Sequence, residues 1–62
     1  MQDRIRKMVK LAKIENEDIF YKDFAGFLNI TEHSFYNWLK GYYDLSDKKA
    51  KMLEDLLTDL LA

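Results

Sequence analysis

Residues 23–41 read DFAGFLNITEHSFYNWLKG, and this stretch decides the fold because it encodes two short helices joined by a tight turn. Phe24, Phe27 and Leu28 are spaced by three and four residues, which predicts that they share one face of the first helix. Asn29 follows that helix, and asparagine tolerates the left-handed backbone conformation that a helix end often requires. Ile30 is then placed to fill the turn with an apolar side chain.

The second half of the stretch carries the start and stop signals of another helix. Thr31 is suited to cap it, because a threonine hydroxyl accepts a hydrogen bond from a backbone N–H of the first turn. Phe35, Trp38 and Leu39 repeat at spacings of three and four, so they are predicted to form its buried face. Gly41 is predicted to end the helix, since glycine adopts a positive φ without steric cost.

The combined pattern resembles the helix-turn-helix of the lambda-repressor and Cro class, the XRE family. The features that carry this resemblance are the small Ala25, the Asn29 turn, the Thr31 cap and the ending Trp38-Leu39-Lys40-Gly41. The resemblance implies that residues 1–62 form one all-α domain of four helices, with the second and third helices as the helix-turn-helix. It also implies a small phage or bacterial transcription regulator of the repressor type, which binds a double-stranded DNA operator as a homodimer.

In this family the second helix of the motif enters the major groove, and its first turns read base edges. The resemblance therefore points to a set of DNA-binding residues on that helix, at the start of the preceding helix and in the following loop: Thr31, Glu32, His33, Ser34, Tyr36, Asn37, Lys40, Tyr21, Lys22 and Tyr42. Asparagine makes a bidentate contact to adenine, and a carboxylate accepts from the amino group of cytosine. For each residue, simple solvent exposure is the alternative interpretation.

Two departures from the family pattern concern the backbone contacts. Phe20 and Tyr21 stand where family members often place a short polar residue and a glutamine that touch a phosphate. Tyr42 and Tyr43 stand where basic residues are usual.

The charge distribution separates the first helix from the rest of the chain. The net charge is −1, which does not by itself favour a nucleic-acid binder. Five basic residues nevertheless precede Ile14 against Asp3 alone, namely Arg4, Arg6, Lys7, Lys10 and Lys13. In a helix over residues 2–14, spacing assigns Met1, Ile5, Met8, Val9 and Ala12 to the core face and Arg6, Lys10 and Lys13 to the opposite face. That basic face is either a solvated surface or a contact to phosphates.

The end of the chain predicts a long amphipathic helix. Asp18 is the predicted cap of the second helix, and Ser46 or Asp44 that of the last one. The apolar arc of the last helix contains Ala50, Leu53, Leu56, Leu57, Leu60 and Leu61. Because this arc continues to the final residues of a short chain, Leu57, Leu60 and Leu61 are predicted to form a dimer interface. The alternative is that they only cover the first helix.

Composition argues against several other classes of function. The chain has no cysteine and one histidine, so a thiolate or multi-histidine metal site is not expected, nor is a cofactor. It lacks a catalytic triad and a glycine-rich phosphate loop, so we do not expect an enzyme. No apolar run is long enough for a membrane span or a signal peptide, which predicts a cytoplasmic protein.

The competing hypothesis to a DNA regulator is a protein-binding module on the same scaffold, such as a phage inhibitor or antirepressor, because the motif is mildly acidic and rich in tyrosine.

Overall fold

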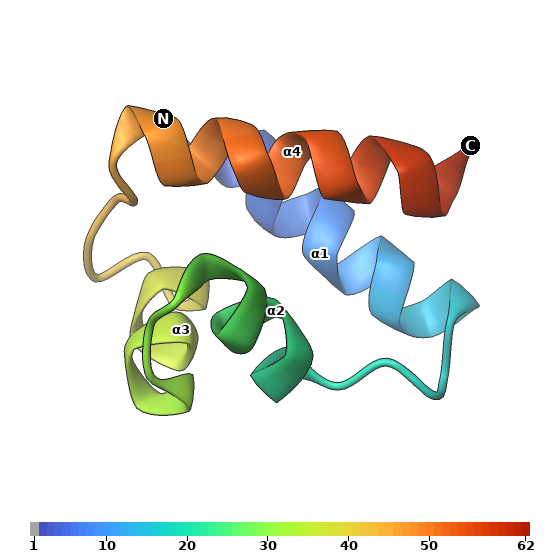
Figure 1. Cartoon of the computed structure of the whole chain (residues 1–62), viewed down its shortest axis with the longest axis horizontal. Coiled ribbons are helices and arrows are strands. Elements are labelled where there is room, and N and C mark those ends of the chain that lie inside the picture. The colour runs from blue at the N-terminus through green and yellow to red at the C-terminus, as the bar shows by residue number, and fades with distance from the viewer. Residues whose placement is uncertain (1) are drawn as a thin grey trace.

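A computed structural model describes residues 2–62, which form four helices (Figure 1). The helices are α1 (Asp3–Glu15), α2 (Tyr21–Leu28), α3 (Glu32–Leu39) and α4 (Asp47–Leu61). The long helices α1 and α4 pack against each other, and α2 and α3 pack together as the helix-turn-helix on the other side of the core. The predicted all-α fold with four helices is thus confirmed. Met1, which was assigned to the core face of the first helix, lies outside the described residues.

The turn between α2 and α3 has the backbone geometry that its sequence predicts. Asn29 is left-handed, with a φ of 58°, and the N–H of Ile30 donates to the carbonyl of Ala25 over 3.0 Å. Thr31 caps α3, since its Oγ1 accepts from the backbone N–H of Ser34 over 3.0 Å. These bonds satisfy backbone groups that the two helix ends would otherwise leave unpaired. They fix the angle at which α3 leaves α2.

The cap of α2 differs from the prediction, whereas the cap of α4 is one of the two predicted candidates. Asp18 does not cap α2; instead the backbone N–H of Phe20 donates to Oδ2 of Asp23 over 2.8 Å, so a carboxylate inside the first turn reaches back. Between the two candidates for α4, Ser46 is the cap, because its Oγ accepts from the N–H of Lys49. Asp44 is engaged elsewhere, by Arg6.

Aromatic side chains form the centre of the core. Phe24, Phe35 and Trp38 are almost completely buried, and the ring centroids of Phe35 and Trp38 lie 5.4 Å apart. The prediction that Phe27 shares this buried face was wrong, because its side chain is 45 % exposed. The inner positions of α2 are taken by Phe24, Ala25 and Leu28, and Phe27 stands at the margin of the face that they define.

The prediction that Arg6 lies on the face of the first helix opposite the core, either solvated or in contact with phosphates, was also wrong. Arg6 is 7 % exposed, and its guanidinium lies 5.0 Å from the centroid of the Trp38 ring. Its Nε donates to the carbonyl of Trp38 over 2.6 Å, and Nη2 donates to the carbonyl of Tyr43 over 2.8 Å. Ion pairs with Asp3 and Asp44, each at 3.0 Å, balance its charge. A buried arginine is tolerated here because carbonyls and carboxylates occupy its donors.

Gln2 adds a second link from the start of α1 to the same region. Its Oε1 accepts from Nε1 of Trp38 over 2.7 Å and from the N–H of Leu45 over 2.9 Å, while its Nε2 donates to the carbonyl of Leu45. Together, Gln2 and Arg6 tie the end of α3 and the following loop to α1. No helix among residues 2–62 has the length and apolar character needed to cross a membrane.

Arg6→Ala is expected to lower the free energy of unfolding by about 3–5 kcal/mol. The change leaves the carbonyls of Trp38 and Tyr43 without their donor and removes a buried side chain that packs on Trp38, whereas the exposed carboxylates of Asp3 and Asp44 regain water. The matched control is Arg4→Ala, which removes an ion pair with Glu54 from a side chain that is 69 % exposed. That loss is expected to stay below about 1 kcal/mol. Urea unfolding followed by Trp38 fluorescence measures both. Equal losses for the two variants would show that Arg6 does not hold the fold together.

Candidate nucleic-acid interface

The outward side of α3 carries the polar residues predicted to read DNA. Phe35 and Trp38 turn inward, and helical spacing therefore turns His33, Tyr36 and Lys40 outward. His33, Tyr36 and Lys40 are exposed, as is Glu32, and Asn37 is half-buried beside them. We call these five residues the α3 row.

Two other predicted contact residues of the motif are engaged within the protein. The hydroxyl of Thr31 is used in the cap of α3. The Oγ of Ser34 lies 2.6 Å from Oη of Tyr43, and Oη of Tyr43 donates to the carbonyl of Ser34 over 2.9 Å. This pair fastens the loop after α3 to one flank of the helix. The hydroxyls of Thr31 and Ser34 therefore already have hydrogen-bond partners within the protein when a ligand approaches the α3 row.

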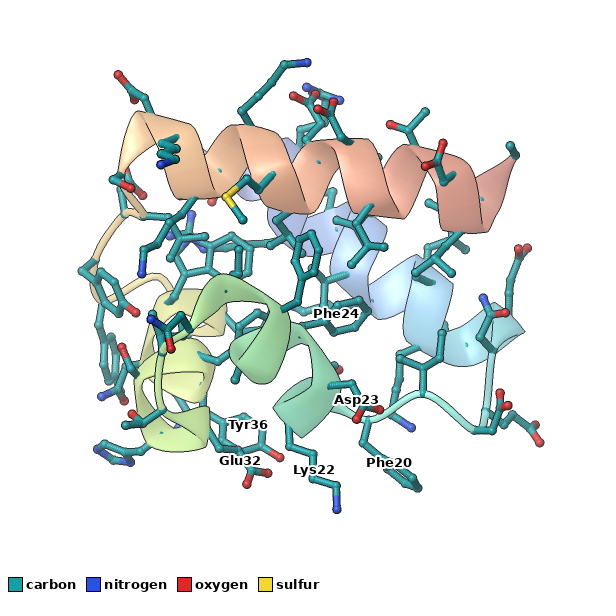
Figure 2. The ribbon with its side chains drawn as sticks, in the orientation of Figure 1. Phe20, Lys22, Asp23, Phe24, Glu32 and Tyr36 are labelled. Atoms are coloured by element: carbon teal, nitrogen blue, oxygen red, sulfur yellow. The ribbon has the colours of Figure 1, made fainter. Side chains whose placement is uncertain are left out.

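A groove of about 420 Å³ runs along the other flank of α3. We call it groove one, and its walls come from the end of α1, the start of α2 and the first turns of α3. The lining residues are Lys13, Phe20, Tyr21, Lys22, Glu32 and Tyr36. In Figure 2, Phe20, Lys22, Glu32 and Tyr36 lie along one edge of the molecule, whereas Phe24 points into the interior.

The floor of groove one is aromatic. Tyr21 is half-buried, and its ring centroid lies 5.9 Å from that of Phe35 and 5.6 Å from that of Tyr36. Its ring therefore joins the core to the α3 row, so Tyr21 is chiefly a packing residue. Lys22, the other predicted contact residue on α2, is exposed, and its Nζ lies 5.7 Å from the ring centroid of Phe20.

A second groove, of about 260 Å³, lies between α1 and the end of α3. We call it groove two, and its lining residues are Asp3, Arg6, Lys7, Lys10, Leu39, Lys40 and Gly41. Lys7, Lys10 and Lys40 are exposed there. Since Asp3 and Asp44 pair with Arg6, these three lysines leave groove two with a positive charge.

The two grooves place the basic side of α1 next to the helix-turn-helix. Lys10 lines groove two and Lys13 lines groove one, and both lie one helical turn or two from the buried Arg6. Glu32 is the one acidic side chain that the described chain contributes to groove one. Each groove beside α3 is thus lined by more basic than acidic side chains, although the chain as a whole carries a net charge of −1.

The lysines of α1 were absent from the predicted set of site residues. Their spacing could have identified them, because Lys7, Lys10 and Lys13 follow Arg6 by one, four and seven residues and so lie on or near its side of the helix. Only the burial of Arg6 against the end of α3 reveals which element this side of α1 faces. Tyr42, which was predicted as a contact residue, is 73 % exposed, and its ring centroid lies 6.0 Å from Nζ of Lys40.

The predicted dimer interface requires a correction. Leu57 is fully buried in the core between the helices, so it has no surface left for a partner. Leu60 and Leu61 are half-buried and pack against the core, and their remaining surface lies at the end of α4. Leu57 was assigned to the interface and not to the core because the spacing of apolar residues along one helix does not show which of them the neighbouring helices cover.

No protein-family model, curated protein or solved structure matches this chain. Among residues 2–62, histidine and the acidic side chains do not gather into a group that would hold a metal ion.

Glu32 and Tyr36 form a polar pair in groove one. The phenol Oη of Tyr36 donates to Oε2 of Glu32 over 3.3 Å. The pKa of Tyr36 is raised above its ordinary value. Desolvation is the largest cause, and the hydrogen bond to the Glu32 carboxylate and the negative charge of that carboxylate add to it. The phenol therefore remains a neutral donor across the physiological pH range.

Glu32→Gln is expected to lower the pKa of Tyr36, because it removes the negative charge that opposes formation of the phenolate. An NMR titration of the Tyr36 ring carbons measures the change. Glu17→Gln is the matched control, since Glu17 is an exposed acid that does not line the groove. An unchanged Tyr36 titration in Glu32→Gln would contradict the pairing.

Proposed function

We propose that this protein is a sequence-specific, DNA-binding transcription regulator of the lambda-repressor and Cro type, with α3 in the major groove of a duplex. One observation supports this proposal above the others. The lysines of α1 lie in the grooves beside the α3 row, which a count of charges along the sequence does not show. A convex polar helix flanked by cations matches the shape and charge of a major groove bordered by phosphates.

The roles of individual side chains follow from their positions. Lys7, Lys10 and Lys40 are suited to phosphate contacts, which fix the position of the protein on the duplex without reading its sequence. Asn37 and His33 stand on the outer side of α3 and carry side chains that bond base edges. The α3 row contains no arginine, so the usual bidentate reading of guanine is not part of the proposal.

The proposal includes a homodimer. Two-fold symmetry would place two copies of α3 about one DNA turn apart, roughly 34 Å, so that each reads one half-site. The half-buried Leu60 and Leu61 at the end of α4 are the proposed contacts, and Leu57 is no longer among them. The proposal places the protein in the cytoplasm of a bacterial cell, where its operator would lie.

A protein-binding module is the second candidate function. Tyr36, Tyr42 and Phe20 are exposed around α3, and tyrosine provides contact area at low entropic cost. In that case Glu32 would face a lysine or arginine of a partner protein. Fold alone does not choose between these two functions.

Duplexes selected from a random library provide the test of DNA binding. Asn37→Ala is expected to weaken binding by about 1–3 kcal/mol and to relax the preference at one base pair. Lys40→Ala should weaken all sequences alike and reduce the slope of log affinity against log salt by about one, because one fewer counterion is released. Lys51→Ala is the control of equal charge, since Lys51 lies on α4 and pairs with Asp55.

Failure of the unaltered protein to bind any duplex at low salt, together with capture of a protein partner through Tyr36 or Tyr42, would favour the second candidate.

Leu60→Asp is expected to turn a dimer into a monomer, because it places a charge in the proposed apolar contact. Sedimentation at micromolar concentration measures the mass, and circular dichroism checks that the helices persist. Thr58→Asp adds the same charge to an exposed position of α4 and should leave the dimer intact. A monomeric mass for the unaltered protein would refute the dimer.

A further inference from the structure

Two exposed aromatic rings lie near the ends of α3, and lysines lie beside them. Phe20 is 52 % exposed, and the Nζ atoms of Lys13 and Lys22 lie 5.2 and 5.7 Å from its ring centroid. Tyr42 has a similar arrangement with Lys40 beyond the other end of α3. Scattered exposed aromatics are common on protein surfaces. The feature that indicates a ligand is the exposed ring of Phe20 in groove one, with two lysines of the same groove beside it.

Duplex readout does not use this combination. In a duplex the faces of the bases are stacked inside, so an exposed ring has no base to stack on. Proteins that bind single strands, in contrast, combine a basic groove along the backbone with aromatic rings on which unpaired bases stack. Groove one supplies the ring of Phe20, and Lys13 and Lys22 supply the charge beside it.

Groove one also has two chemically different ends. Figure 2 shows Phe20 at one end and the pair of Glu32 and Tyr36 at the other, with Lys22 between them. Its volume of about 420 Å³ falls within the range of pockets that hold small ligands. The lysines suit a phosphate, whereas the Glu32 carboxylate repels a phosphate and accepts from an amino group of a base. The groove thus favours one orientation of a nucleotide.

We propose that groove one binds an unpaired nucleotide of a single-stranded nucleic acid, with the base stacked on Phe20, its amino group directed to Glu32 and its phosphates held by Lys13 and Lys22. Contacts between an ammonium and an exposed ring are weak. Either lysine therefore moves from the ring to a phosphate at little cost when the base arrives.

A strand is favoured over a free nucleotide because the basic surface continues. Lys10 lies about one helical turn from Lys13 on α1 and lines groove two together with Lys40, whose Nζ lies 6.0 Å from the ring centroid of Tyr42. A chain of nucleotides that leaves groove one therefore meets further cations and a second exposed ring. A single nucleotide would use only the first groove.

The experiment is fluorescence anisotropy at low salt with labelled oligodeoxycytidylate of about 12 nucleotides, a length within the range that single-strand binders cover. Phe20→Ala is expected to weaken binding roughly tenfold, the loss that removal of one stacking ring produces. Phe27→Ala is the matched control, because Phe27 is 45 % exposed but does not line either groove. Phe20→Tyr should retain binding, and circular dichroism checks that each variant is helical.

Two further arms test the orientation and the length of the ligand. Oligodeoxythymidylate lacks an exocyclic amino group, so the unaltered protein should bind oligodeoxycytidylate more tightly, and Glu32→Gln should reduce that preference. Cytidine monophosphate, added as a competitor, should displace the oligonucleotide only at much higher concentration. Equal displacement per nucleotide would overturn the assignment to a strand.

Equal losses for Phe20→Ala and Phe27→Ala, or no binding of the oligonucleotide at low salt, would overturn the proposal as a whole. These outcomes are separate from those of the duplex experiment. Phe20→Ala should leave duplex binding through the α3 row unchanged, whereas Asn37→Ala should affect the duplex alone.

Discussion

The buried guanidinium of Arg6 is the interaction on which the rest of this structure depends. Through it, the side of α1 that helical spacing places opposite the core is bound to the carbonyl of Trp38 in α3 and to the loop that follows. A charge is expensive to bury, so such a contact persists only when its partners are fixed with it. Here the partners belong to three separate segments, and Asp3 and Asp44 balance the charge. Together with Gln2, which bonds Trp38 and Leu45, this side chain holds α1 against the end of the helix-turn-helix.

This position decides the electrostatic character of the surface around α3. The helix-turn-helix is mildly acidic when its own residues are counted, and α1 is basic. Because Arg6 turns its side of α1 toward α3, Lys10 and Lys13 enter the grooves beside the α3 row. A low net charge therefore does not exclude contact with a polyanion, since the local field depends on where the charges lie.

The same surface combines two kinds of chemistry. The row of polar side chains on α3 is convex and suited to hydrogen bonds with base edges. The flank toward the end of α1 is grooved, and it combines lysines with the exposed ring of Phe20. Tyr36 belongs to both, because its phenol bonds Glu32 while its ring packs on Tyr21. Phe20 and Tyr42 thus lie near opposite ends of α3, each beside a lysine.

The sequence by itself determined the local structure, because each signal acts over a few residues. Asn29 and Thr31 define the turn and the cap through bonds to their own neighbours, and the spacing of Phe24, Phe35 and Trp38 identifies the central core. Periodicity along one helix does not show which other element covers a position. The exposure of Phe27 and the role of Arg6 were therefore missed, and whether a partner or the chain itself covers Leu57 stayed open until the structure showed it buried.

Only the tertiary structure decided the composition of the candidate site. The α3 row follows from helical spacing and was predicted, whereas the lysines of α1 join it through packing between elements far apart in the chain. The burial of Arg6 depends on acceptors that lie more than thirty residues away in sequence. No local pattern contains such partners, because they come together only when the helices dock around a shared core.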